Sequence, residues 1–154
     1  MQPIHISSSR IKTCLPLSIL SLLAGGLIYV LARPKNLLLF LVAEHIRLDD
    51  TINTMRAHLD FTHWPEWAIY NLPGAFWSLS YILFVDIFAS QLSLSLRLLL
   101  VGIIPFVGFI SEILQYVGIL PGTYDTIDAI CYAVPFVIYA IITIITHSSE
   151  KYEH

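Results

Sequence analysis

Four apolar stretches, each about as long as a membrane-spanning helix, constrain this chain more than any other feature. A spanning helix needs about 20 mainly apolar residues, because the hydrocarbon layer is roughly 30 Å thick and each helical residue rises about 1.5 Å. The four stretches cover residues 14–32, 72–91, 98–119 and 127–146. We therefore predict an all-α, polytopic membrane protein with about four transmembrane helices in a single domain over residues 1–154.

The composition agrees with this prediction and argues against other classes. Apolar residues make up 56% of the chain and charged residues 12%, against roughly 25% charged in soluble domains. A soluble domain of this size exposes most of its residues to water, and a disordered chain has low hydrophobicity. The net charge is −3, and without a basic patch we expect no nucleic-acid partner. Cys14 and Cys131 lie in apolar stretches and are predicted to be small buried side chains.

The connection over residues 33–67 differs from the spans. Residues 36–43 are very apolar but too short to cross a membrane. Three apolar residues further on have helical spacing, with Asp49 or Asp50 as the expected N-cap: Ile52, Met55 and Leu59. Aromatic residues, which favour the headgroup layer, follow: Trp64, Trp67 and Tyr70. We predict an interfacial amphipathic segment, with a lid over a site as the alternative.

The positive-inside rule leaves the orientation weakly determined. With four spans, both termini share one side, and lysine and arginine are equally numerous on the two sides. Arg10 and Lys12 flank the first helix to be inserted, which favours cytoplasmic termini.

Two carboxylates fall inside predicted spans, where charge is costly and marks a functional hypothesis. Asp86 lies in an apolar run, so we expect it to be largely protonated or bonded to Ser90 or Arg97; Asp86→Asn should then be tolerated. Glu112 is placed about 10 Å nearer the loop side than Asp86 by helical rise, too far to share a proton directly. Gln115 lies on the same helical face as Glu112.

Further polar residues converge with Glu112 on the loop side of the bundle. These candidate ligand-binding residues are Asn71, Trp77, Ser78, Gln115, Thr123 and Asp125, with Asp128 opening the fourth span. Structural alternatives remain open for two of the acidic residues. Asp125 suits the N-cap of the last helix, and Glu112 with Gln115 suits an inter-helix hydrogen-bond pair.

These residues carry a resemblance to a known family. Glu112-x-x-Gln115, the Pro-Gly-Thr-Tyr-Asp loop at residues 121–125 and Asp128 together resemble the signature of VanZ-like membrane proteins. Residues 71–77 also resemble the start of an earlier helix in small bacterial members. The chain departs from the family pattern at Thr123, where arginine is common. It departs also at Tyr132, often asparagine, and at Gly74, often acidic.

The resemblance implies a multi-pass protein of the bacterial cytoplasmic (inner) membrane. The named family member is linked to low-level resistance to the antibiotic teicoplanin. A member with polar residues gathered at one membrane face would bind or modulate a cell-envelope lipid or glycan precursor. Membrane lipids are then the expected surroundings, with a homo-oligomer or a membrane partner as a further possibility.

Three other function classes stay open at this stage. An intramembrane enzyme would use Glu112 or Asp128 as a general acid or base, or as a ligand of a divalent cation, which carboxylate and amide oxygens suit. No other cofactor is expected, and zinc is disfavoured. A small transporter or channel would relay protons through Asp86 and Glu112 and would need an oligomer. A partner-binding subunit would carry these acidic residues mainly for structure.

Overall fold

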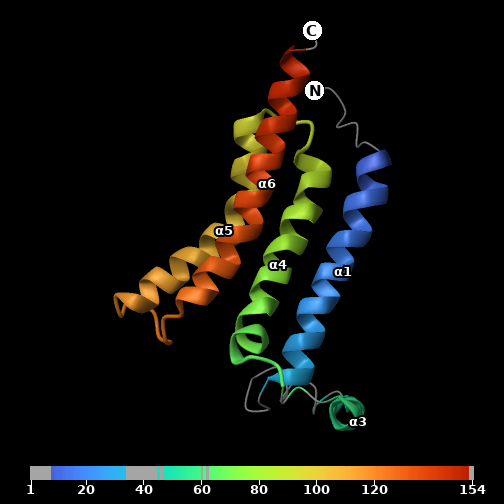
Figure 1. The fold of residues 1–154 in the computed structure, drawn as a ribbon, viewed down its shortest axis with the longest axis vertical. Helices are drawn as coiled ribbons and strands as arrows, with labels where there is room; N and C mark the ends of the chain where they lie inside the picture. Colours follow the sequence, from blue (N-terminus) through green and yellow to red (C-terminus); the bar gives the residue numbers. More distant parts are fainter. Residues whose placement is uncertain (1–7, 34–44, 46, 60, 62, 153–154) are drawn as a thin grey trace.

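The computed structural model describes residues 8–33, 45, 47–59, 61 and 63–152, and within them it is helical without strands. Figure 1 shows the helices in chain order. They are α1 (Ser8–Ala32), α3 (Asp49–His58), α4 (Glu66–Ala89), α5 (Leu94–Tyr116) and α6 (Thr126–Tyr152). Four of them, α1, α4, α5 and α6, are long and apolar enough to cross a membrane, which confirms the predicted fold class.

The helix boundaries differ from those predicted from hydropathy. α4 begins at Glu66 rather than at residue 72, directly after Pro65 in an extended conformation. Trp67 and Tyr70 therefore belong to this helix and not to the connection. α5 ends at Tyr116 rather than at residue 119, because Gly118 adopts the positive φ of 77° that commonly follows a helix end.

The amphipathic segment forms α3, which packs beside the end of α1. Leu48 occupies its N-cap position, so Asp49 and Asp50 lie in the first turn and the N-cap expected from the sequence is wrong by one or two residues. Nε of Arg56 donates to the carbonyl oxygen of Leu31 at 2.9 Å, which satisfies a free carbonyl at the end of α1. Figure 1 shows α3 nearly end-on, so it runs across the bundle. Residues 36–43 lie outside the described residues.

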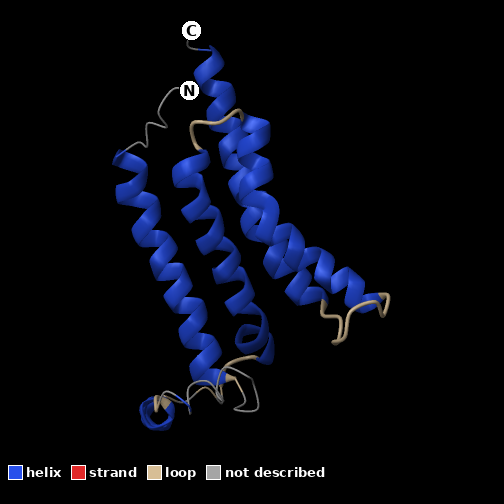
Figure 2. Cartoon of the chain, turned by 180° about the vertical axis from the view of Figure 1, so that it is seen from behind, coloured by secondary structure: helices blue, strands red, loops and turns tan. Residues whose placement is uncertain are grey.

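α4 is the central helix of the bundle. It packs against α1, α5 and α6, whereas α1 contacts only α3 and α4 among the described elements. Of the 18 most apolar consecutive residues of α4, 44% are buried, against 17% or fewer of those in each of the other spans. Figure 2 shows α4 between α1 and the α5–α6 pair. The outer helices expose mainly apolar side chains, as expected for a lipid-facing surface.

Small residues let α1 approach α4 closely. Ser18, Ser21 and Gly25 are buried on one face of α1. Oγ of Ser18 donates to the carbonyl oxygen of Ser80 at 2.8 Å. A Cβ added at Gly25 would lie 2.8 Å from Nε1 of Trp77, so glycine is needed for this contact. Small interfacial residues and inter-helix hydrogen bonds are the usual basis of helix association in membranes.

The first prediction tests the transmembrane arrangement. The loop after α5 and helix α3 lie at one end of the bundle, opposite the start of α1 and the end of α6 (Figure 1). With Cys14 and Cys131 replaced by alanine, a membrane-impermeant maleimide should label Thr123→Cys and Ser148→Cys from opposite sides of the membrane. Labelling of both from the same side of intact cells would contradict four crossings.

Candidate functional site

Four polar residues from three helix ends meet at the loop side of the bundle. We call Asn71, Glu112, Asp125 and Asp128 the loop-side cluster. Nδ2 of Asn71 donates to Oδ2 of Asp125 at 2.9 Å, and Asn71 also lies beside Asp128. Oε2 of Glu112 accepts from the backbone amide of Asp125 at 3.1 Å. The structure thus joins residues of α4, α5 and α6 through one short loop.

Local structure explains why these side chains meet. Asp125 directly precedes α6, and its Oδ1 accepts from the backbone amide of Ile127 at 2.8 Å, as a helix-capping carboxylate does. Glu112 is four residues from the end of α5, so the short loop returns the chain to it. Asn71 and Glu112 are only 1% and 5% exposed, so their polar atoms depend on partners in the protein.

Hydrogen bonding favours the ionised form of Asp125. Asn71 and the amide of Ile127 donate to Asp125, and this lowers the pKa of its carboxyl below the usual value. Arg33, just after α1, is the cation whose charge acts on Asp128. Its guanidinium lies over the ring of Tyr70 and donates to the carbonyl oxygen of that residue.

Arg33 does not stand out as a site residue in the sequence, where it lies directly after the first apolar stretch. Its Nε is buried and has no hydrogen-bond partner among the described residues. Its position in the sequence could have indicated a role, because Arg33 follows the first span at the same end of the bundle as the loop at residues 121–125. Buried polar atoms are normally paired, so this Nε is a donor that a ligand or a water molecule can satisfy.

A cavity of about 240 Å³ opens beside the loop-side cluster. It is lined by Glu66, Trp67, Tyr70, Asn71, Asp125 and Ile127. Two aromatic side chains, two carboxylates and one amide therefore border the same space. Two members of the loop-side cluster, Asn71 and Asp125, contribute directly to its wall.

The remaining predicted ligand residues lie outside this cavity. Gln115 packs against Gly122, where an added Cβ would come within 2.9 Å of the Gln115 amide carbon. Ser78 is deeper in the bundle and donates to the carbonyl oxygen of Tyr132 at 3.1 Å. Trp77 faces α1, with its ring centroid 5.3 Å from that of Tyr29. Thr123 is exposed in the loop.

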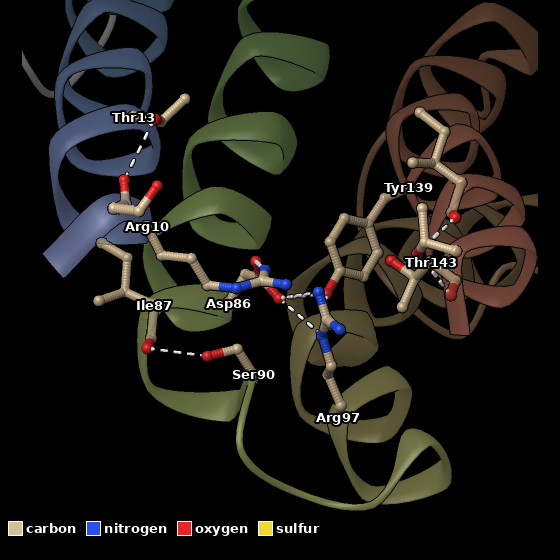
Figure 3. Close-up of polar contacts among 11 residues, drawn as sticks. Arg10, Thr13, Asp86, Ile87, Ser90, Arg97, Tyr139 and Thr143 are labelled. Atoms are coloured by element: carbon tan, nitrogen blue, oxygen red, sulfur yellow. Dashed lines mark hydrogen bonds and ion pairs between the residues drawn. The ribbon is translucent and has the colours of Figure 1, made fainter. Parts of the chain in front are cut away.

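Asp86 is the centre of a second polar network, at the other end of the bundle (Figure 3). Its Oδ2 lies 2.6 Å from Nη1 of Arg10, and its Oδ1 lies 2.7 Å from Nε and Nη2 of Arg97. The hydroxyl of Tyr139 donates to Oδ1 at 2.5 Å. The expected link to Arg97 is confirmed, whereas the hydroxyl of Ser90 instead donates to the carbonyl oxygen of Ile87.

The position of Asp86 also corrects the depth estimate. Asp86 lies within the apolar run of residues 82–88, but it is only three residues from the end of α4 and therefore near one end of the bundle. Asn71 and Glu112 both bond Asp125, so Asn71 marks the depth of Glu112 in the bundle. Asn71 lies fifteen residues before Asp86 in α4, which is about 22 Å by helical rise. The predicted separation of about 10 Å was too small, because α4 begins earlier and α5 ends earlier than the hydropathy indicated.

No group of three or more His, Cys, Asp or Glu residues that could hold a metal ion occurs in the described part of the chain. No family model, curated protein or solved structure matches this sequence.

The second prediction revises the expected effect of Asp86→Asn. Arg10 and Arg97 would lose their only described carboxylate partner, and Asp86 itself is 3% exposed. Removing one member of a buried charge pair is strongly destabilising. We expect the free energy of unfolding to fall by about 3 kcal/mol, measured by thermal or detergent unfolding of the purified protein. Asp50→Asn, at an exposed carboxylate of α3, should leave it unchanged; an equal result for both variants would contradict the assigned role of Asp86.

Proposed function

We propose that this chain is a VanZ-like protein of the bacterial cytoplasmic membrane that binds the sugar-bearing headgroup of a cell-envelope lipid or glycan precursor. The cavity beside the loop-side cluster supports this proposal most directly. It combines exposed aromatic faces with carboxylate and amide groups at one end of a transmembrane bundle.

The chemistry of the cavity suits a ligand rich in hydroxyl groups. Carboxylates accept hydrogen bonds from hydroxyls, and amides both donate and accept them. Trp67 and Tyr70 offer flat apolar faces to the non-polar side of a sugar ring, with the polar groups fixing its orientation. Arg33, with a buried nitrogen atom that has no described partner, supplies a nearby cation for an attached phosphate.

The orientation belongs to the same proposal. Cytoplasmic termini, favoured by Arg10 and Lys12, would place the loop-side cluster on the outer face of the membrane. A ligand of the cell envelope would then reach the cavity either from the outer leaflet or from the envelope itself. Resistance to a glycopeptide antibiotic is the phenotype that such binding would produce.

A structural role for the acidic residues is the second candidate. Glu112 accepts a hydrogen bond from the backbone amide of Asp125, and Asp125 caps α6. These contacts hold the loop between α5 and α6 without any ligand. On this reading the chain is a partner-binding subunit, and the loop-side cluster acts as inter-helix hydrogen bonding.

The third prediction tests ligand binding at the cavity. Nanodisc-embedded protein is titrated with a polyprenyl diphosphate that carries N-acetylglucosamine, and with the sugar-free polyprenyl diphosphate of the same chain length. We expect tighter binding of the sugar-bearing lipid, weakened by about tenfold in Trp67→Ala because an aromatic contact is lost. Trp64→Ala is the matched control, since Trp64 is similarly exposed but does not line the cavity. Equal affinities for the two lipids would argue against sugar recognition.

The fourth prediction uses Glu112→Gln to separate binding from packing. The amide oxygen can still accept from the Asp125 backbone amide, so thermal stability should stay near that of the wild type. If the negative charge serves the ligand, the affinity for the sugar-bearing lipid should fall. Unchanged affinity together with unchanged stability would favour the structural-subunit reading.

A further inference from the structure

A separate cavity lies at the opposite end of the bundle, where α1 begins and α4 ends. Its volume is about 420 Å³, and we call it the termini-side pocket. Its polar lining residues are Arg10, Ser90, Gln91, Arg97, Thr146 and His147. These side chains come from α1, the α4–α5 connection, α5 and α6.

The termini-side pocket carries an excess positive charge. Arg10 and Arg97 both contact the single carboxylate of Asp86, so one of the two cationic charges is not neutralised by it. The lining residues include no Asp or Glu. Asp86 is 4% exposed at its side chain, whereas the Arg10 side chain is 38% exposed. The carboxylate is thus shielded beneath the guanidinium that reaches the pocket.

Both guanidinium groups retain nitrogen atoms for another acceptor. Nη2 of Arg10 and Nη1 of Arg97 take no part in the described contacts with Asp86 and Tyr139. A guanidinium is planar and matches the geometry of a phosphate group. The hydroxyl of Thr146 already donates to backbone carbonyl groups of its own helix. The two arginines, together with Gln91 and His147, are then the donors of the lining that can face an anion.

The location of the termini-side pocket places it at headgroup level. Arg10 is the third residue of α1 and Arg97 the fourth residue of α5, so both lie at helix ends next to apolar spans. Basic pockets between transmembrane helices bind anionic headgroups in other membrane proteins. From these observations we propose that the termini-side pocket binds one phosphate group, supplied by an anionic phospholipid or by free phosphate, between Arg10 and Arg97.

This site does not depend on the function proposed for the loop-side cluster. The two lie at opposite ends of the bundle, with Asp86 about 22 Å along α4 from Asn71. Either site can therefore fail its test without affecting the other.

The experiment titrates purified protein with phosphatidylglycerol and phosphatidylcholine, using native mass spectrometry, and with inorganic phosphate, using thermal unfolding. We expect phosphatidylglycerol to be retained in preference to phosphatidylcholine. Arg10→Gln should weaken that retention by about tenfold, because it removes hydrogen bonds from a charged donor. Lys12→Gln is the matched control: it removes the same charge from the same helix, at a residue that does not line the pocket.

Each outcome decides the proposal. Stabilisation by inorganic phosphate in the wild type but not in Arg10→Gln, without a lipid preference, supports the phosphate site and assigns it a soluble ligand. Equal weakening by Arg10→Gln and Lys12→Gln overturns the proposal, because attraction is then unspecific. Binding of neither ligand also overturns it.

A second variant covers the case in which Arg10→Gln does not fold. Gln91→Glu adds a negative charge to the pocket wall and leaves the contacts of Asp86 intact. Loss of phosphatidylglycerol retention and of phosphate stabilisation in this variant supports the phosphate site. Unchanged binding of both in a stably folded Gln91→Glu protein overturns it.

Discussion

The Asp86 carboxylate joins all four spanning helices at one end of the bundle. It lies on the central helix α4 and contacts Arg10 of α1, Arg97 of α5 and Tyr139 of α6. In lipid, apolar side chains gain little by moving from lipid to protein, so helix association relies on close packing and polar contacts. One shared anion therefore fixes the relative positions of helices that are otherwise mostly exposed to lipid.

The fold could be predicted from sequence because membrane spans leave a strong signal in hydropathy. The ends of the spans were harder to predict, because the first turns of α4 contain polar and aromatic residues. Glu66 and Asn71 fit an interfacial connection as well as they fit a helix. Only the structure shows that Asn71 points into the bundle, where it is 1% exposed and bonded to Asp125.

The candidate site was predictable where the chain enforces proximity, and in part where a residue such as Asn71 lies at the matching end of its span. Glu112 and Asp125 are joined by a short loop, and the structure places them in contact. Arg97 follows Asp86 closely along the chain, so that pair could also be expected. Arg10 and Tyr139 are 76 and 53 residues from Asp86, and nothing in the sequence indicates which helix faces they occupy. Long-range pairing of this kind requires the packing of α1 and α6 on α4.

Gly74 and Tyr132 are neighbours in space. The ring of Tyr132 covers Gly74, where an added Cβ would lie 3.3 Å from the ring, and it also covers Gly108, where a Cβ would lie 2.5 Å away. A longer side chain at residue 74 would compete with Tyr132 for this volume, so a bulky residue at one position favours glycine at the other. The loop that contains Thr123 has no lysine or arginine. Arg33 brings a positive charge to Asp128 from the end of α1 instead. The positive charge near the proposed ligand site therefore depends on how α1 packs against α4, and not on the loop.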